Sequence, residues 1–312
     1  MLENNHRGLR RGNVFGDIKD IDMQQLAKAF NADPLYLLTA GFPCQPFSME
    51  GYGLGTDDQA QGSIIEYVLE GIKAMLPRGF LLENVEGLMS SHLPTLLRII
   101  SNIKKIKGPR FQGYNVYYKI LDSRTTSGIP HSRRRLFIVG IWKVLDEKFG
   151  GFKWPADVLA SDPLDKFLDP DKGTALPATR TALANYTKCL EKVGGPNPVS
   201  TLKKGNYVGD LMLGLKRNVN LMANTCPCMT RQHAGGNYYW SFSRNRYLNS
   251  NELMKLQGIE QGTARLVNPP QVSDRQVKMM VGNSMDVKTV ARIFIHMFKA
   301  MGFSAARLRD PV

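Results

Sequence analysis

Cysteine is scarce in this chain, and long apolar runs are absent. The four cysteines, Cys44, Cys189, Cys226 and Cys228, are too few and too irregularly spaced for a disulfide framework. One residue separates Cys226 from Cys228, and no histidine pair follows at zinc-finger spacing, so we predict no structural metal. No segment approaches the ~20 apolar residues that span a bilayer, and the basic amino terminus lacks a signal peptide's apolar core. We therefore expect a soluble intracellular protein in a reducing compartment, which would be the nucleus in a eukaryote and the cytoplasm in a bacterium.

Acidic residues are outnumbered by basic ones. The 312 residues include 27 Asp and Glu against 41 Lys and Arg, which gives a formal net charge of +14. Such an excess indicates an anionic partner, and nucleic acid is the first candidate because phosphate contacts dominate its binding. A generic basic protein is the alternative on charge alone. The length suits one large domain, or a large domain with a smaller one, and we find no internal repeat.

Apolar runs and helical periodicities alternate in the first half of the chain. Strands are predicted at residues 35–40, 80–82, 114–121 and 136–141, and helices at 23–30, 64–76, 95–106, 251–256 and 287–301. Asp22 is a plausible N-cap for the first of these helices. This alternation predicts an α/β sheet that is covered on both faces. Ligands of such sheets collect beyond the carboxyl ends of strands, where both Cys44 and Glu83 are expected.

The pattern weakens between residues 142 and 224, where prolines, glycines and lysines are scattered. This region predicts a second, smaller and loop-rich unit. Beyond it, the aromatic residues 238–242 crowd beside Arg244 and Arg246, which suits either nucleic acid contact or a satellite hydrophobic cluster. The glycine-rich segment 51–55 lacks the Lys-Ser/Thr ending of a phosphate cradle, so we interpret it as a hinge or lid.

Cys44 is held between Pro43 and Pro46, directly after the first predicted strand. Proline fixes its own φ and restricts the residue before it, so the loop should be stiff. A thiol at a rigid strand end is suited to act as a nucleophile. The spacing alone does not prove a nucleophile, because most cysteines in such a position only fill the loop.

The order of four short motifs resembles the 5-methylcytosine methyltransferase family. These are Phe42-Pro43-Cys44-Gln45, Glu83-Asn84-Val85, Arg133-Arg134-Arg135 and, after a variable region, Gly282-Asn283-Ser284. The resemblance implies a Rossmann-like α/β sheet of S-adenosylmethionine-dependent methyltransferases, incomplete at its N-terminal end, with a small loop-rich target-recognition domain. It places the catalytic domain at residues 1–141 and 246–312, and the recognition domain at residues 142–245.

The same resemblance implies roles for four residues in methyl transfer to carbon 5 of cytosine in DNA. Cys44 is the thiol that adds to carbon 6 of the ring. Glu83 matches the glutamate that donates a proton at ring nitrogen 3. Arg133 and Arg135 match alternating arginines that hold the flipped base and backbone. Arg134 points to the opposite side of a strand, so we expect it to face solvent.

S-adenosylmethionine is the cofactor that the resemblance implies. Its predicted contacts are Asp17, Ile18, Pro43 and Ile64, together with Asn283, Ser284 and Met285, whose free N–H groups at the start of the last helix would suit a carboxylate. Predicted substrate contacts are Gln45, Ser48, Asn84, Arg244 and Arg246. Thr230, and the pairing of Arg246 with Glu252, also resemble a family segment that supports the recognition domain, which gives Arg246 a structural alternative.

The main departure from the family is its first strand, with a Phe-x-Gly-x-Gly loop, for which we find no match. Without that strand, residues 35–40 should form an exposed sheet edge. We therefore expect a second polypeptide that supplies the strand and the loop, a truncated product or a degenerate protein. His131 also stands where glutamine is usual, and residues 128–133 and 228–230 resemble relatives that methylate transfer RNA. Transfer RNA methylation and a non-catalytic DNA-binding or regulatory subunit remain alternatives.

Overall fold

The structure, a computed structural model, describes eight stretches of the chain. They are residues 16–28, 35–43, 64–108, 111–158, 161–212, 218–259, 272–304 and 309–312. The predictions for Cys44, Gln45, Ser48 and the glycine-rich segment 51–55 lie outside these residues. Within the eight stretches, no helix combines the length and the apolar character needed to cross a bilayer.

Four strands form the first sheet, in the order β1-β2-β4-β3. Their bounds are β1 (Leu37–Gly41), β2 (Gly79–Val85), β3 (Tyr114–Asp122) and β4 (Arg134–Trp142). β1 and β2 are parallel, whereas β4 runs antiparallel to both β2 and β3. All four predicted strands are confirmed. β2 and β4 extend beyond the predicted apolar cores because Glu83 and Arg135 continue the ladder between them.

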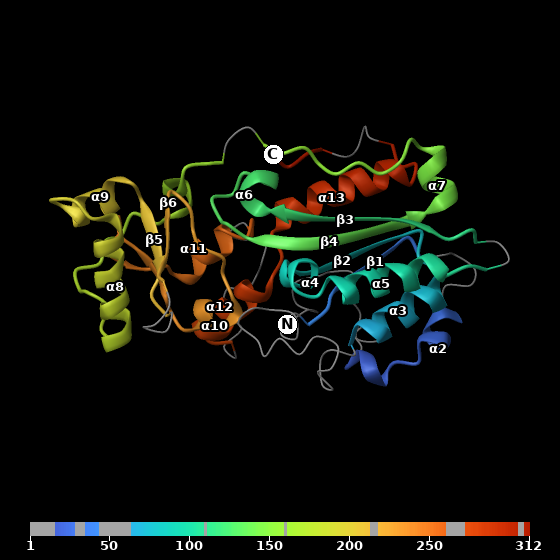
Figure 1. Ribbon diagram of the computed structural model, residues 1–312, viewed down its shortest axis with the longest axis horizontal. Coiled ribbons are helices and arrows are strands. Elements are labelled where there is room, and N and C mark those ends of the chain that lie inside the picture. Colours follow the sequence, from blue (N-terminus) through green and yellow to red (C-terminus); the bar gives the residue numbers. More distant parts are fainter. Residues whose placement is uncertain are drawn as a thin grey trace.

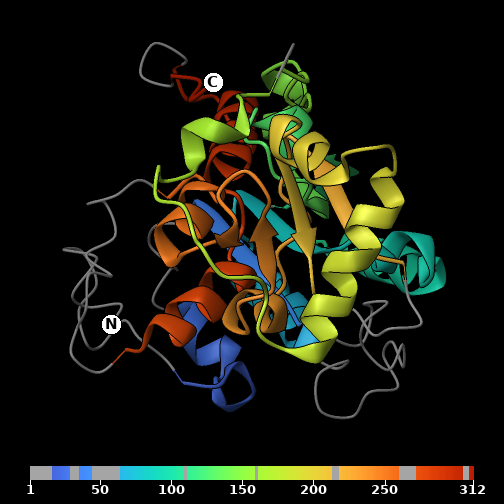
Figure 2. The ribbon, with the colours of Figure 1, turned by 90° about the vertical axis from the view of Figure 1, so that its left-hand side faces the viewer.

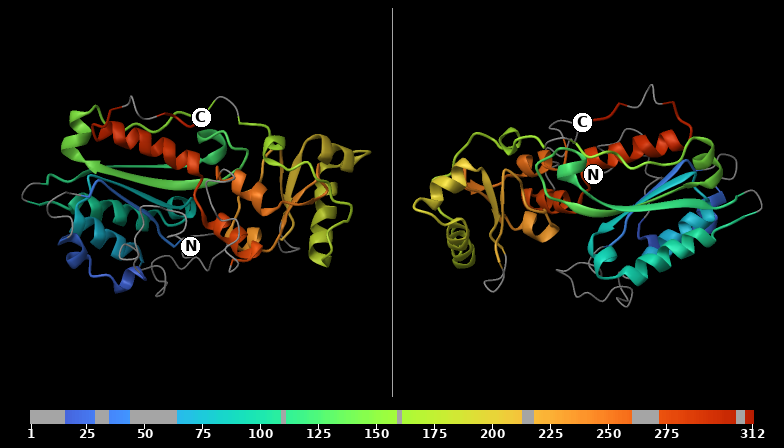
Figure 3. Two further views of the ribbon diagram at one scale, coloured as in Figure 1. Left: turned by 180° about the vertical axis from the view of Figure 1, so that it is seen from behind. Right: turned by 45° about the horizontal axis from the view of Figure 1, so that its top comes forward.

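Helices cover both faces of this sheet, as the alternation of elements predicted (Figures 1 and 3). One face carries α2 (Met23–Lys28), α3 (Ile64–Met75), α4 (Gly87–Ser90) and α5 (Leu93–Lys105). The other carries α6 (Ser123–Thr126), α7 (Lys143–Lys148) and α13 (Val287–Ala300). Alternate residues of β2 separate the two cores: Phe80 and Leu82 pack with α3 and α5, whereas Leu81 packs with α13.

Asp22 caps α2 as expected, because its Oδ1 accepts hydrogen bonds from the amides of Gln24 and Gln25 at 2.9 and 3.0 Å. β1 is an edge strand, which also matches the prediction. Among the described residues it pairs only with β2, and none of its five residues is fully buried. Its second edge therefore has backbone groups that another strand could pair with.

The second unit contains a four-stranded antiparallel sheet in the order β6-β5-β7-β8 (Figure 2). Its strands are β5 (Tyr207–Asp210), β6 (Asn220–Ala223), β7 (Tyr239–Ser241) and β8 (Arg246–Tyr247). Around them lie η5 (Leu164–Phe167), α8 (Arg180–Val193), α9 (Pro198–Lys204), α10 (Arg231–Gly235), α11 (Ser250–Lys255) and α12 (Asp274–Asn283). The expectation of a loop-rich unit missed this sheet, because strands of two to four residues are too short to produce a visible period.

The aromatic residues of β7, and Phe242 directly after it, belong to the interior of this unit. Tyr239, Trp240 and Phe242 are each 2% exposed. Phe242 stacks on Tyr186 of α8, with ring centroids 5.2 Å apart, and Trp240 meets Tyr247 edge-on at 4.9 Å. Of the two interpretations that the sequence allowed, the structure therefore favours a hydrophobic cluster over an aromatic nucleic acid contact for these three side chains.

Candidate active site

The ends of β1 and β2 meet at the side of the first sheet that faces the second unit (Figure 1). Gly41 and Glu83 are paired across these strands. Asn84 is buried, and its Nδ2 donates a hydrogen bond to the carbonyl of Phe42 at 3.3 Å, while its Oδ1 accepts one from the amide of Val85 at 2.8 Å. Asn84 was predicted to contact substrate. That contact stays a prediction, and the bonds of Asn84 hold the segment that leads to Pro43.

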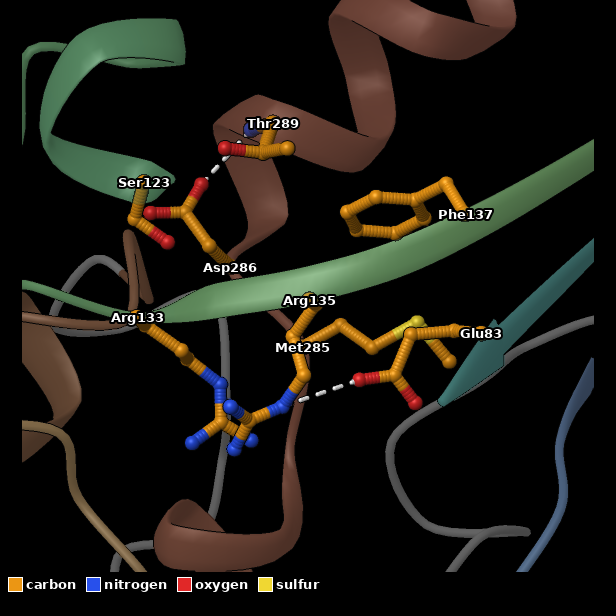
Figure 4. A pocket seen from close by; sticks show the side chains of 8 residues that line it. All are labelled: Glu83, Ser123, Arg133, Arg135, Phe137, Met285, Asp286 and Thr289. Atoms are coloured by element: carbon orange, nitrogen blue, oxygen red, sulfur yellow. Dashed lines mark hydrogen bonds and ion pairs between the residues drawn. The ribbon is translucent and has the colours of Figure 1, made fainter. Parts of the chain in front are cut away.

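Glu83 and Arg135 form the ionic centre of this region (Figure 4). Arg135 Nε lies 3.2 Å from Glu83 Oε1, and the two side chains are 14% and 13% exposed. Arg135 Nη1 also donates to the carbonyl of Arg134 at 2.7 Å. A Cβ at Gly41 would lie 3.4 Å from Glu83 Oε2 and 3.0 Å from Met285 Cε, so a glycine gives both side chains their space. The pair joins a carboxylate and a guanidinium that remain partly open to a ligand.

The linker between α12 and α13 corrects one prediction about the cofactor. Asn283 is the last residue of α12, and the amide and hydroxyl of Ser284 both donate to the carbonyl of Val281. Asp286, not Asn283, caps α13, with its Oδ1 accepting from the amide of Thr289 at 2.6 Å. The prediction that residues 283–285 open the last helix was therefore wrong. The carboxylate of Asp286 already occupies the start of α13, where the carboxylate of the cofactor was expected.

Asp286 is a site residue that the sequence predictions missed, although its position three residues before Thr289 is ordinary N-cap spacing. It lines a small cavity of about 10 Å³ together with Glu83, Ser123, Arg133, Arg135, Phe137, Met285 and Thr289. Burial raises the pKa of Asp286, which Ser127 Oγ contacts at 2.9 Å. The cavity has room for about one water molecule, so a larger ligand has to meet Glu83 and Arg135 from their exposed side.

Arg133 is buried, and its guanidinium is bound to backbone carbonyls. Nη1 donates to Met229 at 2.6 Å, and Nη2 donates to Ser284 at 2.6 Å and to Gly282 at 3.3 Å. Burial lowers the pKa of Arg133, and the charge of Arg135 lowers it further. These bonds join the residue before β4 to the second unit and to the linker before α13. The predicted contact of Arg133 with the flipped base stays a prediction.

Arg134 and Arg133 provide a direct comparison of an exposed and a buried arginine. As predicted, Arg134 faces solvent. Its side chain is 54% exposed and forms a two-pronged ion pair with Glu86 at 2.7 and 2.9 Å. This ion pair lowers the pKa of Glu86 and raises that of Arg134.

Arg133→Met is expected to lower the free energy of unfolding by about 2–4 kcal/mol, because it leaves three carbonyls inside the protein without their donor. The neighbouring Arg134→Met should cost no more than about 1 kcal/mol, because it removes only an exposed ion pair. Urea unfolding followed by circular dichroism measures both changes. Equal losses in the two variants would contradict the assigned role of Arg133.

His131 also links the first sheet to the second unit. It is fully buried, and its Nε2 accepts a hydrogen bond from the amide of Met229 at 3.0 Å. The flanking backbone bonds are Ser132 N–H to Cys226 O, at 3.0 Å, and Cys226 N–H to Pro130 O, at 2.7 Å. A backbone contact is therefore made here by histidine in place of the usual glutamine. Burial, and after it the charge of Arg133, lowers the pKa of His131 well below its ordinary value.

The lowered pKa of His131 predicts a loss of stability in mild acid. As the pH falls, the unfolded chain, with a histidine pKa of ~6.5, binds a proton before the folded protein does. Neutral His131 therefore gives its full contribution to the free energy of unfolding only above that pH. We therefore expect the free energy of unfolding to fall between pH 7.5 and pH 5.5, in part through this residue. His131→Gln keeps an acceptor for Met229 and should lose less between pH 7.5 and pH 5.5 in urea unfolding. An identical loss in both proteins would disprove the assignment.

Arg244 and Arg246 are engaged within the second unit. Arg244 Nε donates to the carbonyl of Asp169 at 2.9 Å, and its Nη2 lies 2.9 Å from Asp165. Arg246 forms a two-pronged ion pair with Glu252, at 2.9 and 2.8 Å. This geometry favours the structural alternative for Arg246, and the contacts of both arginines with substrate stay predictions.

Thr230 has the supporting role that the sequence indicated. Its Oγ1 accepts from the amide of His233 and so caps α10. A Cβ at Gly282 would lie 2.4 Å from the Thr230 carbonyl, so the close contact between α12 and this segment requires glycine.

Residues near β1 fit the adenine end of the predicted cofactor. Asp17 begins a short 3-10 helix, η2 (Ile18–Asp20), and Ile18 and Ile64 are half-buried against the same core cluster as Phe42. An apolar surface beside a carboxylate suits a flat ring that has an exocyclic amino group. Pro43 follows Phe42 directly, so four of the predicted contacts lie in or beside this cluster.

Comparison with known proteins shows which family the chain belongs to. The model of the C-5 cytosine-specific DNA methylase family matches residues 1–299. The chain is 30% identical over 278 residues to the type II methyltransferase M.NgoBI of Neisseria gonorrhoeae, which covers 88% of this chain and 76% of that protein. It is 29% identical over 307 residues to M.HaeII of Haemophilus aegyptius, which covers 96% and 83%.

Solved structures agree on the fold. The methyltransferase EhMeth of Entamoeba histolytica matches with a TM-score of 0.60 and 15% identity, over 93% of this chain and 83% of that chain. A mutant of Spodoptera frugiperda DNMT2 matches with a TM-score of 0.58 and 17% identity, over 91% and 85%. With the order of motifs and the pair of Glu83 and Arg135, the matches over nearly the whole chain identify it: the protein belongs to the C-5 cytosine-specific DNA methylase family.

Proposed function

We propose that Glu83 and Arg135 bind the ring edge of a cytosine that has left the DNA stack, beside the thiol of Cys44. The observation that carries this proposal is their ion pair of 3.2 Å at the carboxyl end of β2, next to the end of the strand that leads to Cys44. A protonated glutamate can donate to ring nitrogen 3, and a guanidinium can donate to the neighbouring carbonyl oxygen. The family's reaction, methylation of cytosine at carbon 5 in DNA, requires both contacts.

Each residue then has a defined step. The Cys44 thiolate adds to carbon 6 while Glu83 gives a proton to nitrogen 3, so carbon 5 becomes the nucleophilic end of an enamine. Bound S-adenosylmethionine supplies a methyl group on a sulfonium. Once carbon 5 carries the methyl group, loss of its proton allows the bond between sulfur and carbon 6 to break. The proton on nitrogen 3 returns to the Glu83 carboxylate, so the aromatic ring, the thiolate and the protonated glutamate are all restored. Arg135 stabilises negative charge at the ring oxygen while the adduct exists.

Target recognition and catalysis are assigned to different parts of the chain in this proposal, and the boundary at residue 245 assigns β8, α11 and α12 of the second unit to the catalytic domain. Residues 142–245 serve as the target-recognition domain, and residues 1–141 and 246–312 as the catalytic domain, with intracellular DNA as the substrate. The joint formed by His131 and Arg133 supports this division, because it fixes the second unit directly beside Glu83 and Arg135. The basic excess of the chain suits a phosphate backbone.

A second polypeptide completes the cofactor site in this proposal. The open edge of β1, which among the described residues pairs only with β2, offers backbone donors and acceptors to an added strand. The residues that fit adenine, Ile18 and Ile64, lie on the adjacent face. A strand with the family's Phe-x-Gly-x-Gly loop would pair there and hold the methionine end of the cofactor.

Transfer of labelled methyl groups tests the proposed function. The chain is purified alone and after co-expression with a polypeptide that carries the family's first strand and loop, and each sample receives duplex DNA or transfer RNA. We expect incorporation into DNA by the co-expressed pair. Preferential labelling of transfer RNA would overturn the assignment of DNA. Salt-sensitive DNA binding without cofactor binding, by calorimetry, in both samples would support a non-catalytic subunit instead.

A further inference from the structure

A basic groove lies at the end of the first sheet that is remote from Glu83. It has a volume of about 500 Å³, and its lining comes from the segment after α5, from β3 and from the start of α7. The lining residues are Lys104, Lys107, Gln112, Gly113, Tyr114, Asn115, Val116, Tyr117 and Lys143. Tyr114 lies seven residues along β3 from the partner of Arg135, which corresponds to roughly 23 Å. The groove is therefore separate from the site of methyl transfer.

Lysines flank this groove from both faces of the sheet. Lys104 and Lys107 lie at and just beyond the end of α5, and Lys143 begins α7. These two helices lie on opposite faces of the sheet (Figure 1). Among the described residues, Lys104 and Lys107 form no ion pair, and Lys143 reaches Glu147 only at 3.8 Å. The nearby carboxylate of Asp146 is buried and accepts hydrogen bonds from Asn115 and Tyr117. The exposed charge at the groove is therefore positive.

The strand in the groove has an open edge. Within the described part of the chain, β3 pairs only with β4. A hydrogen bond lies at each end of the β3–β4 ladder: Lys143 N–H donates to Gly113 O at 3.0 Å, and Ser123 N–H donates to Arg133 O at 3.2 Å. The residue pairing between β3 and β4 continues without interruption from one bond to the other. Hydrogen-bonded and non-bonded pairs alternate in an antiparallel ladder, so the backbone groups of Val116 and Tyr118 point away from β4.

We propose that this groove binds an acidic, extended segment of a partner protein, which adds a strand to the free edge of β3. An edge strand offers N–H and C=O groups in alternation, which another strand matches and a phosphodiester chain, with acceptors only, does not. Alternate side chains of the added strand would face Lys104 and Lys107 on one side and Lys143 on the other, so acidic residues are the complement. The alternative is that these lysines protect the edge of β3 from pairing with other chains, in which case an acidic peptide would not bind.

Fluorescence anisotropy with the full chain tests this proposal. The probe is a labelled peptide of about eight residues, half of them glutamate and the rest threonine and valine, and a control peptide has glutamine for glutamate. We expect the acidic peptide to bind at least ~10-fold more tightly than the control. Lys104→Glu with Lys107→Glu should weaken its binding at least ~10-fold, whereas Lys203→Glu with Lys204→Glu, at the end of α9, changes the total charge equally and should alter binding less than ~2-fold.

Val116→Pro separates strand addition from charge attraction. It removes an N–H that points outward, so the ladder with β4 keeps its bonds while peptide affinity should fall about 5-fold. Thermal unfolding checks that the variant is folded. Equal effects of the two lysine pairs, no binding of the peptide, or a larger loss of affinity for duplex DNA than for the peptide on reversal of Lys104 and Lys107 would each overturn the proposal.

Discussion

Replacement of Cys44 by serine is expected to abolish the covalent complex with DNA that contains 5-fluorocytosine, and to lower methyl transfer at least ~10³-fold. Fluorine at carbon 5 cannot leave as a proton, so the bond between sulfur and carbon 6 persists after methyl transfer. A serine hydroxyl is far less acidic than a thiol, so it supplies almost no anion to add to the ring. A gel shift that survives denaturation measures the complex.

Cys228 is the matched control for this experiment. It is partly exposed, and its Sγ lies 3.6 Å from Nη1 of Arg135, so it is the other thiol near the proposed ring position. Cys189 and Cys226 are buried, and burial raises the pKa of both thiols. Cys228→Ser should still form the complex. A complex that persists in Cys44→Ser and disappears in Cys228→Ser would transfer the role of nucleophile to Cys228.

Glu83→Gln is expected to lower kcat by about 10²–10⁴ while KM for DNA changes little. Glutamine can donate a hydrogen bond to ring nitrogen 3 but cannot transfer a proton, so the adduct at carbon 6 loses its main stabilisation. The substitution also removes the charge that faces Arg135 at 3.2 Å. Steady-state methylation of duplex DNA by the co-expressed pair gives both constants.

Glu86→Gln controls for the loss of one negative charge near the same strand end. Glu86 pairs with the exposed Arg134, and it lies three residues beyond Glu83. We expect a change of less than about 2-fold in kcat, because an exposed ion pair contributes little. Equal losses in the two variants would show that net charge, rather than proton donation by Glu83, explains the effect.

The first sheet could be predicted because continuous apolar runs in the sequence indicate strands that are buried on both faces. Phe80 and Leu82, and the apolar residues of β4, form runs that can only be buried strands in a sheet covered on both faces. The meeting of Glu83 with Arg135 could be anticipated from the end of one strand and the start of another. Their distance could not, because it depends on the register between β2 and β4.

Long-range contacts explain what the sequence could not show about the predicted site residues. Arg133 and Arg135 look equivalent in the sequence, but only the fold shows that carbonyls of residues 229, 282 and 284 surround Arg133. Arg244 also resembles a surface cation until Asp165 and Asp169, about 75 residues earlier in the chain, are placed beside it. A single sequence contains no local signal for such partners.

The joint between the two units has a consequence for replacing the proposed recognition domain with that of a relative. Segment 226–230 is sequence of the second unit, yet its backbone is bonded to Pro130, His131, Ser132 and Arg133 of the first. In a chimera whose crossover falls within this segment, the hydrogen-bond donors and acceptors at 226–230 and at 130–133 would come from different proteins and need not match. If the second unit is the recognition domain that we propose, crossovers that keep residues 226–230 with their native partners at 130–133 should transfer sequence preference and leave the pair of Glu83 and Arg135 aligned.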